Sequence, residues 1–143
     1  TYISEAAVIG SEKPHLSAII CIRFSVLSKW AESKRIGFTT YSDLASKKEI
    51  EKLVTKEVKK VNSTLPLKQI IKKFVLLYKE FDADDDELTR TRKLRRGFVI
   101  KKYSNIVEAI YKNIKDIDID TSIKLQDGGI QKIRTKLSII NLE

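Results

Sequence analysis

The chain has 143 residues and a formal net charge of +9, with 42% hydrophobic and 33% charged residues. This length fits one compact domain, and the apolar content excludes a disordered or low-complexity polymer. With one cysteine and one histidine, disulfide frameworks and Cys/His metal clusters are excluded. The longest purely apolar run, at 18–22, is too short to span a bilayer, so we expect a soluble, cytoplasmic protein.

The positive charge favours an anionic partner, and nucleic acid, nucleotides, phosphates and an acidic membrane surface are all open. Methionine is absent from the whole chain, including position 1. Because translation starts with methionine, we expect a piece of a larger protein or a processed chain.

Residues 6–9 and 16–24 have the pattern of a β-hairpin. The first run is apolar and ends at Gly10, and the second alternates between two faces. The face with Ile19 and Cys21 also carries polar residues, so we expect it to be half-buried. Cys21 is expected to be a small buried hydrophobe rather than a nucleophile.

Two helices should follow this hairpin. Ser25 can cap the first, and Gly37 supplies its stop. A capping box at 46–49 begins the second, whose apolar residues recur at helical spacing until Pro66 ends it. The opposite side of the second helix carries Lys52, Lys56, Lys59 and Lys60.

A third strand is predicted at 73–81, after a turn near 67–69. Helical spacing returns at 94–103 and, after a Ser104 cap, at 106–111. Three strands with the first two helices packed on one face give an α+β fold, a small open sandwich.

The last part of the chain predicts a C-terminal β-hairpin. Residues 117–125 alternate with period two, 127–129 form the turn Asp-Gly-Gly, and 130–140 supply the return strand. We expect this hairpin to attach to the main body.

The connection after the third strand has an acidic run at 82–87 and a basic run at 90–96. Alternate aspartates resemble the start of an EF-hand, but Glu87 and Lys93 occupy the positions that need glycine and glutamate. We therefore expect a solvated acidic turn and no metal site, and an exposed turn position for His15. Repulsion within the basic run favours an anion site, with a solvated helix start equally open.

Five segments of the chain resemble, in order, segments of a known protein family. They are 2–10 (Tyr-Ile-Ser-Glu-Ala-Ala-Val-Ile-Gly), 13–20 (Lys-Pro-His-Leu-Ser-Ala-Ile-Ile), 72–77 (Lys-Lys-Phe-Val-Leu-Leu), 87–96 (Glu-Leu-Thr-Arg-Thr-Arg-Lys-Leu-Arg-Arg) and 102–103 (Lys-Tyr). In this order they resemble the carboxy-terminal domain of AMP-forming long-chain fatty acyl-CoA ligases, within the adenylate-forming acyl-CoA synthetase superfamily.

The resemblance implies that 1–112 is the mobile C-terminal domain, without the hinge segment that precedes it in the family. Residues 113–143 would be a C-terminal β-hairpin extension of the same domain. A larger N-terminal domain of the same chain would bind ATP, Mg and the fatty acid. The parent would form acyl-AMP and then transfer the acyl group to coenzyme A, and the fragment alone should be inactive.

The same resemblance assigns the family's adenylation lysine to Lys93, by its place after Leu-Thr-x-Thr-x. A mobile ammonium suits the anionic centre formed when a carboxylate attacks the α-phosphorus. Arg92 or Arg95 would contact the substrate if the register differed. The family commonly has proline where Arg90 stands, and relatives acting on shorter acids have glycine at the position of Arg92.

Three alternatives stay open. A fatty acyl-AMP ligase would deliver the product to a carrier protein instead of coenzyme A. A basic nucleic-acid-binding module would explain the net charge, but the absence of aromatic residues at 89–97 disfavours it. Peripheral contact with acidic lipids is also possible through the lysines of the second helix.

Overall fold

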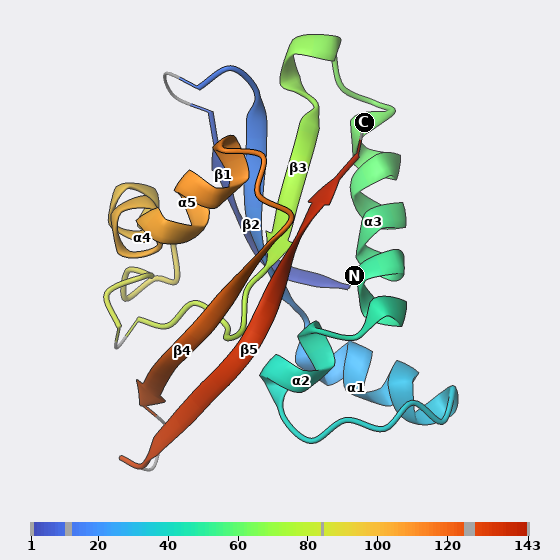
Figure 1. Ribbon diagram of the computed structural model, residues 1–143, viewed down its shortest axis with the longest axis vertical. Helices are drawn as coiled ribbons and strands as arrows, with labels where there is room; N and C mark the ends of the chain where they lie inside the picture. The colour runs from blue at the N-terminus through green and yellow to red at the C-terminus, as the bar shows by residue number, and fades with distance from the viewer. Residues whose placement is uncertain (1, 11–12, 84, 125–127, 143) are drawn as a thin grey trace.

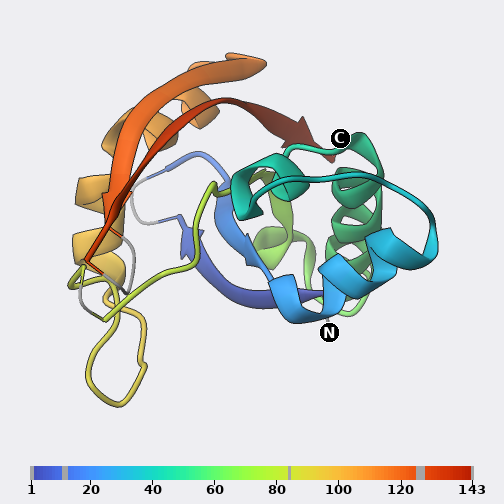
Figure 2. The ribbon, with the colours of Figure 1, turned by 90° about the horizontal axis from the view of Figure 1, so that it is seen from below.

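The computed structural model describes residues 2–10, 13–83, 85–124 and 128–142, and its strands and helices form three layers (Figures 1 and 2). The strands are β1 Ile3–Ile9, β2 Leu16–Ile22, β3 Ile71–Leu76, β4 Asp116–Lys124 and β5 Ile130–Asn141. The helices are α1 Phe24–Ser33, α2 Tyr41–Ala45, α3 Lys48–Asn62, α4 Arg96–Lys102 and α5 Ser104–Tyr111, with a 3-10 turn η1 at Leu67–Gln69.

The strands form one five-stranded sheet in the order β1-β2-β3-β5-β4. β2 and β3 are parallel, and the other neighbouring pairs are antiparallel. The α+β class and both hairpins are therefore confirmed. The C-terminal hairpin continues the main sheet, because β5 also pairs with β3 through residues 139–141. The predicted turn residue Asp127 lies outside the described residues, and Gly128 has a left-handed φ of 87°.

Helices cover both faces of the sheet, which separates two apolar clusters. One face of β1–β3 packs against α4, α5 and the C-terminal hairpin, and the other packs against α1, α2 and α3. The prediction that one side of β2 is only half-buried is wrong, because Ile19 and Cys21 on that side are both 0% exposed. The polar Ser17 on that side is also fully buried. Cys21 is a buried free thiol, as predicted.

The first helix begins and ends at residues other than those predicted. α1 starts at Phe24 after Arg23, so Ser25 is not its cap. At its other end Arg35 takes a left-handed φ of 58°, and the amide of Ile36 donates to the carbonyl of Ala31 at 2.9 Å. This pattern ends the helix before Gly37. An arginine here adopts the conformation for which glycine is usual.

The capping box predicted for α3 does not form. Lys47 precedes that helix and makes no side-chain cap, whereas Ser46 Oγ donates to the carbonyl of Asp43 at 2.7 Å. The short helix α2, which the sequence did not predict, is capped by Thr40, whose Oγ1 accepts from the amide of Asp43 at 3.2 Å. Ser104 is likewise the first residue of α5 rather than its cap.

His15 is half-buried instead of exposed. Its ring lies 4.8 Å from the ring of Tyr111, and its Nδ1 lies 3.3 Å from Ser17 Oγ. Tyr111 also donates to the carbonyls of Ile9 and His15, at 3.1 and 2.8 Å. These bonds tie the β1–β2 connection to α5. Among the described residues, no helix combines the length and hydropathy needed to cross a membrane.

Candidate functional site

The segment between β3 and α4 carries the predicted site residues and projects from the body of the protein (Figure 2). Within it, Leu88 and Leu94 form an antiparallel bridge, and both pack against the apolar cluster under α4 and α5. Residues 88–94 are therefore a small hairpin, here named the Lys93 hairpin. Its two leucines hold it to the core while its turn lies in solvent.

Hydrogen bonds of Thr89 close the turn of the Lys93 hairpin. Its carbonyl accepts from the amide of Arg92 at 2.8 Å, and its Oγ1 accepts from the amide of Lys93 at 3.0 Å. Its own amide donates to the carbonyl of Lys93 at 2.8 Å. Arg90 occupies the second turn position, which favours proline, and Arg92 has a φ of 64°, which favours glycine. The turn thus gives a physical reason why proline suits position 90 and glycine suits position 92.

The three predicted site residues lie in different surroundings. Lys93 is exposed and, within the described residues, makes no ion pair with a carboxylate. Arg92 is exposed at the rim of a cavity. The guanidinium of Arg95 donates to the carbonyl of Asp86 at 3.1 Å and lies 5.2 Å from the ring of Phe98. Lys93 is therefore the one ammonium group among the three predicted site residues, and it is exposed.

A buried carboxylate lies at the base of the Lys93 hairpin. Glu87 is 0% exposed and accepts hydrogen bonds from Lys79 Nζ and the hydroxyl of Tyr103. It also accepts from the amide of Asp82 at 3.0 Å, and Lys102 Nζ lies 3.1 Å from its second oxygen. We name Glu87, Lys79, Lys102 and Tyr103 the Glu87 cluster.

Burial and the carboxylate shape the titration of the neighbouring tyrosines. Burial, and then the hydrogen bond and charge of Glu87, raise the pKa of Tyr103 well above its ordinary range. Burial and the charge of Glu87 also raise the pKa of Tyr78. Both hydroxyls therefore stay protonated at neutral pH, and Tyr103 serves as a hydrogen-bond donor.

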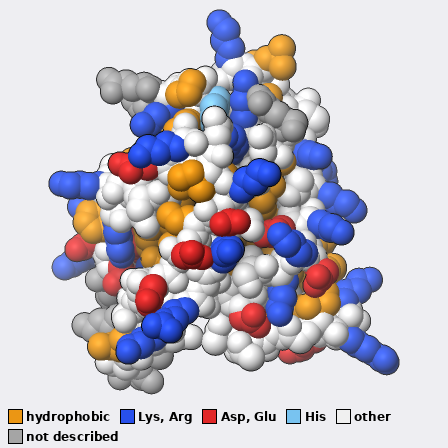
Figure 3. Space-filling view, viewed as in Figure 1, with side chains coloured by type: hydrophobic (Ala, Val, Ile, Leu, Met, Phe, Trp, Pro, Cys, Tyr) orange, Lys and Arg blue, Asp and Glu red, His pale blue; other side chains and the backbone are white. Residues whose placement is uncertain are grey.

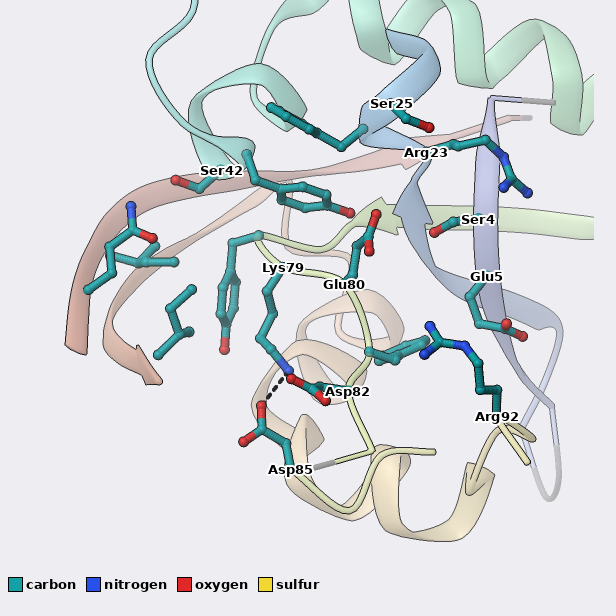
Figure 4. A pocket seen from close by; sticks show the side chains of 17 residues that line it. Ser4, Glu5, Arg23, Ser25, Ser42, Lys79, Glu80, Asp82, Asp85 and Arg92 are labelled. Carbon is teal, nitrogen blue, oxygen red and sulfur yellow. Dashed lines mark ion pairs between the residues drawn. The ribbon is translucent and has the colours of Figure 1, made fainter. Parts of the chain in front are cut away.

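A cavity of about 840 Å³ lies beside this region, between β1, the start of α1, the segment after β3 and the C-terminal hairpin (Figure 4). Arg92 reaches it from the Lys93 hairpin, while Arg23 and Ser4 face it from the sheet. Lys79 points toward Asp85 in its wall, at 3.0 Å. The wall mixes acidic and basic groups, so it has no strong preference for an anion.

Metal ligation receives no support from the described residues, which hold no group of three acidic, histidine or cysteine side chains able to bind an ion. Of the alternate aspartates considered above, Asp84 lies outside the described residues. Glu87 is already surrounded by cations. The expected solvated acidic turn is wrong at Glu87, which is buried.

Comparisons with known proteins identify the family of this chain. The model of the family described as "AMP-binding enzyme C-terminal domain" matches residues 1–115. The chain belongs to this family. The chain is also similar to the long-chain-fatty-acid CoA ligase FadD15 of Mycobacterium tuberculosis. The two are 34% identical over 111 residues, which cover 76% of this chain and 18% of the relative.

This AMP-binding enzyme C-terminal domain is also 26% identical over 130 residues to the long-chain-fatty-acid CoA ligase ACSBG1 of Homo sapiens, covering 79% of this chain and 18% of the relative. The chain thus spans 18% of the length of these curated relatives. No solved structure matches. The family membership confirms the resemblance seen in the sequence.

The sequence missed the Glu87 cluster of this AMP-binding domain. Glu87 stands in an acidic run, and its partners come from positions 79, 102 and 103, so no local spacing connects them. Helical spacing predicts a helix that includes position 103, and the resemblance includes 102–103, but neither connects these residues to Glu87. A buried role for its tyrosine was not predicted.

Proposed function

We propose that this chain is the mobile C-terminal domain of a long-chain fatty acyl-CoA ligase, and that Lys93 assists formation of the acyl-adenylate. The observation that supports this most is the exposed ammonium of Lys93 on a hairpin whose backbone is held by Thr89 and by the Leu88–Leu94 bridge. Such a group can enter another domain's active site without breaking contacts of its own. The names of the similar proteins supply the substrate class.

The proposed reaction has two steps. The fatty acid carboxylate attacks the α-phosphorus of ATP, forming acyl-AMP and releasing pyrophosphate. The thiol of coenzyme A then attacks the acyl carbon, and AMP leaves. In the first step Lys93 would neutralise negative charge on the acyl and phosphoryl oxygens as a compact point charge, without transferring a proton.

ATP, Mg and the fatty acid would be held mainly by an N-terminal domain. The described residues offer cations for phosphate oxygens, in Lys93 and Arg92, but no cluster of carboxylates for a metal. The small domain would close for adenylation and reorient for thioester formation. Because the substrates would bind to the N-terminal domain, we expect this chain alone to have no turnover. We propose that the full-length protein acts in the cytoplasm.

The test is Lys93→Ala in the full-length protein. Because the charge is needed in the first step, pyrophosphate release from ATP and fatty acid should fall by about 100-fold or more, the scale of a lost electrostatic donor. Thioester formation from supplied acyl-AMP should change little. The matched control is Lys101→Ala, which removes an exposed lysine from α4. Unchanged pyrophosphate release in the Lys93 variant would remove this residue from the mechanism.

The acyl acceptor needs a separate experiment. The full-length protein should form thioester with coenzyme A when palmitate and ATP are supplied. Transfer only to a phosphopantetheinylated carrier protein would instead identify a fatty acyl-AMP ligase.

A second surface supports contact with an anionic membrane. The exposed side of α3 carries the predicted lysines, and Figure 3 shows basic side chains along this edge. At the end of α3, Val61 is 54% exposed and Leu67 in η1 is 85% exposed, beside the exposed Lys68. Apolar tips flanked by lysines suit a surface of anionic lipid.

Vesicle sedimentation tests this contact. The protein should bind phosphatidylserine vesicles at low salt, and Leu67→Ser with Lys59→Glu should weaken binding, whereas Lys101→Glu should weaken it less. Equal binding of all variants would contradict the proposed surface. Binding to DNA oligonucleotides that depends on Arg90 and Arg92 would favour the nucleic-acid alternative instead.

A further inference from the structure

The carboxylate of Glu87 is connected to the Lys93 hairpin through the backbone as well as through its side chain. The carbonyl of Glu87 accepts from the amide of Arg95 at 2.9 Å, and its amide donates to the carbonyl of Asp82 at 3.1 Å. The residues next to Glu87 and Arg95 are Leu88 and Leu94, which form the bridge of the hairpin. Glu87 therefore lies where both strands of the hairpin leave the protein body.

The side chain of Glu87 fixes this point relative to the rest of the fold. Its donors come from the segment after β3, from α4 and from the α4–α5 junction, namely Lys79, Lys102 and Tyr103. Tyr103 is 3% exposed and lies in the apolar cluster with Val99 and Ile106. Groups from two separate parts of the chain, Lys79 and the adjacent pair Lys102 and Tyr103, thus hold one carboxylate, which restricts both the position and the direction of the hairpin.

We propose that Glu87 is a positioning residue for Lys93: it sets the direction in which the hairpin presents the ammonium to the reaction centre. This inference rests on the proposed role of Lys93. A hydrophobic residue could also fill a buried site, and often with equal or better stability. A carboxylate with several donors instead specifies one orientation, because its bonds weaken steeply when their angles change.

The consequence for catalysis is geometric. A displacement of about 1 Å at a reacting group can cost about 100-fold in rate. The Glu87→Gln substitution keeps the size of the side chain, but its amide group points hydrogens either at Lys79 and the amide of Asp82 or at Tyr103 and Lys102. The base of the hairpin should shift while the turn, closed by Thr89, stays intact.

The experiment measures both half-reactions of the full-length protein. Glu87→Gln should lower kcat for pyrophosphate release by about 10- to 100-fold with KM for ATP and fatty acid unchanged. Thioester formation from supplied acyl-AMP should stay within about twofold of the parent protein. The control is Glu108→Gln, which changes an exposed glutamate of α5 paired only loosely with Lys112, at 3.9 Å; it should leave both rates unchanged.

A double variant distinguishes positioning from general stability. In the Lys93→Ala protein, adding Glu87→Gln should cost little further adenylation rate, because the group it positions is already absent. Multiplicative losses would overturn the inference, as would equal slowing of both half-reactions or no slowing by Glu87→Gln. If Lys93→Ala alone has no effect on adenylation, the proposed role of Lys93 is wrong. If Lys93→Ala slows adenylation but Glu87→Gln does not, only the positioning role of Glu87 is wrong.

If Glu87→Gln does not fold, Tyr103→Phe serves as the second variant. It removes one donor to Glu87 and keeps the ring among its aromatic neighbours Tyr78 and Phe81, whose centroids lie 6.3 and 6.4 Å away. Adenylation should fall by about 10-fold, again without further loss in the Lys93→Ala protein. Full adenylation activity in folded Tyr103→Phe would contradict the positioning role.

Discussion

The base and the tip of the segment between β3 and α4 both carry charged residues, yet their surroundings differ. In the Glu87 cluster, the carboxylate is buried and meets defined partners from positions 79 and 102–103. In the Lys93 hairpin, Arg90 and Lys93 are exposed. Charge at the base fixes geometry, whereas charge at the tip is available to another molecule. The predictions below test this division.

The largest expected difference is in stability. Glu87→Ala removes the acceptor of two buried donors, Tyr103 and Lys79, and leaves Lys79 only Asp85, so it should lower the free energy of unfolding by about 3–5 kcal/mol. Lys93→Ala removes an exposed side chain and should stay within about 0.5 kcal/mol of the parent chain. Urea unfolding followed by circular dichroism measures both. Similar losses for the two variants would remove the distinction between base and tip.

The apolar attachment of the hairpin should also matter. Leu88 is 5% exposed and bridges to Leu94, so Leu88→Ala should cost about 2–4 kcal/mol through lost burial and a remaining cavity. Thr91→Ala, at the exposed turn, is the control and should cost little. If only the turn held the hairpin, Thr91→Ala would lower the free energy of unfolding more than Leu88→Ala.

Alkaline pH should destabilise the folded protein in part through Tyr103. The raised pKa of Tyr103, caused by burial and Glu87, means that the folded state keeps a proton that the unfolded state loses above pH 10, the ordinary value. The stabilising contribution is complete below pH 10 and falls by about 1.4 kcal/mol for each pH unit above it. Tyr103→Phe should therefore show a shallower decline between pH 10 and 11. An unchanged slope would argue against a buried, protonated Tyr103.

The smallest effect concerns the turn. Arg92 has a φ of 64°, so Arg92→Gly should relieve backbone strain and raise stability by up to about 1 kcal/mol, less the entropy that glycine loses on folding. Arg90→Pro at the second turn position should add about 0.4–1 kcal/mol. Thermal unfolding measures both. Destabilisation by Arg90→Pro would mean that its φ differs from that of an ordinary turn.

Sequence patterns predicted those features that depend on neighbouring residues. Alternation identified β2 and the C-terminal hairpin, and a local motif placed Lys93 in a loop. The complete burial of Ile19 could not be seen, because the residues covering it, such as Ile106 and Ile110, lie far along the chain. The acidic run around Glu87 likewise predicted an exposed side chain. Its burial could not be predicted, because its partners Lys102 and Tyr103 lie further along the chain.

The helix ends were predicted less well because several serines offered similar caps. Ser25, Ser46 and Ser104 all fit the preferences for an N-cap, yet the residues at the N-caps are Arg23, Lys47 and Tyr103. Packing of Phe24 and Leu27 against the sheet fixes α1 more strongly than a cap, which is worth about 1 kcal/mol. Tertiary burial decided these boundaries.

The pairing of β5 with β3 has a practical consequence for producing the protein. The family match ends at residue 115, but β5 completes the hydrogen bonding of β3, and Ile133 and Leu137 join its apolar cluster. A chain shortened to the matched residues would leave β3 as an open sheet edge beside uncovered apolar side chains. Such edges recruit strands from other molecules, so we expect the truncated chain to aggregate more readily than the longer one.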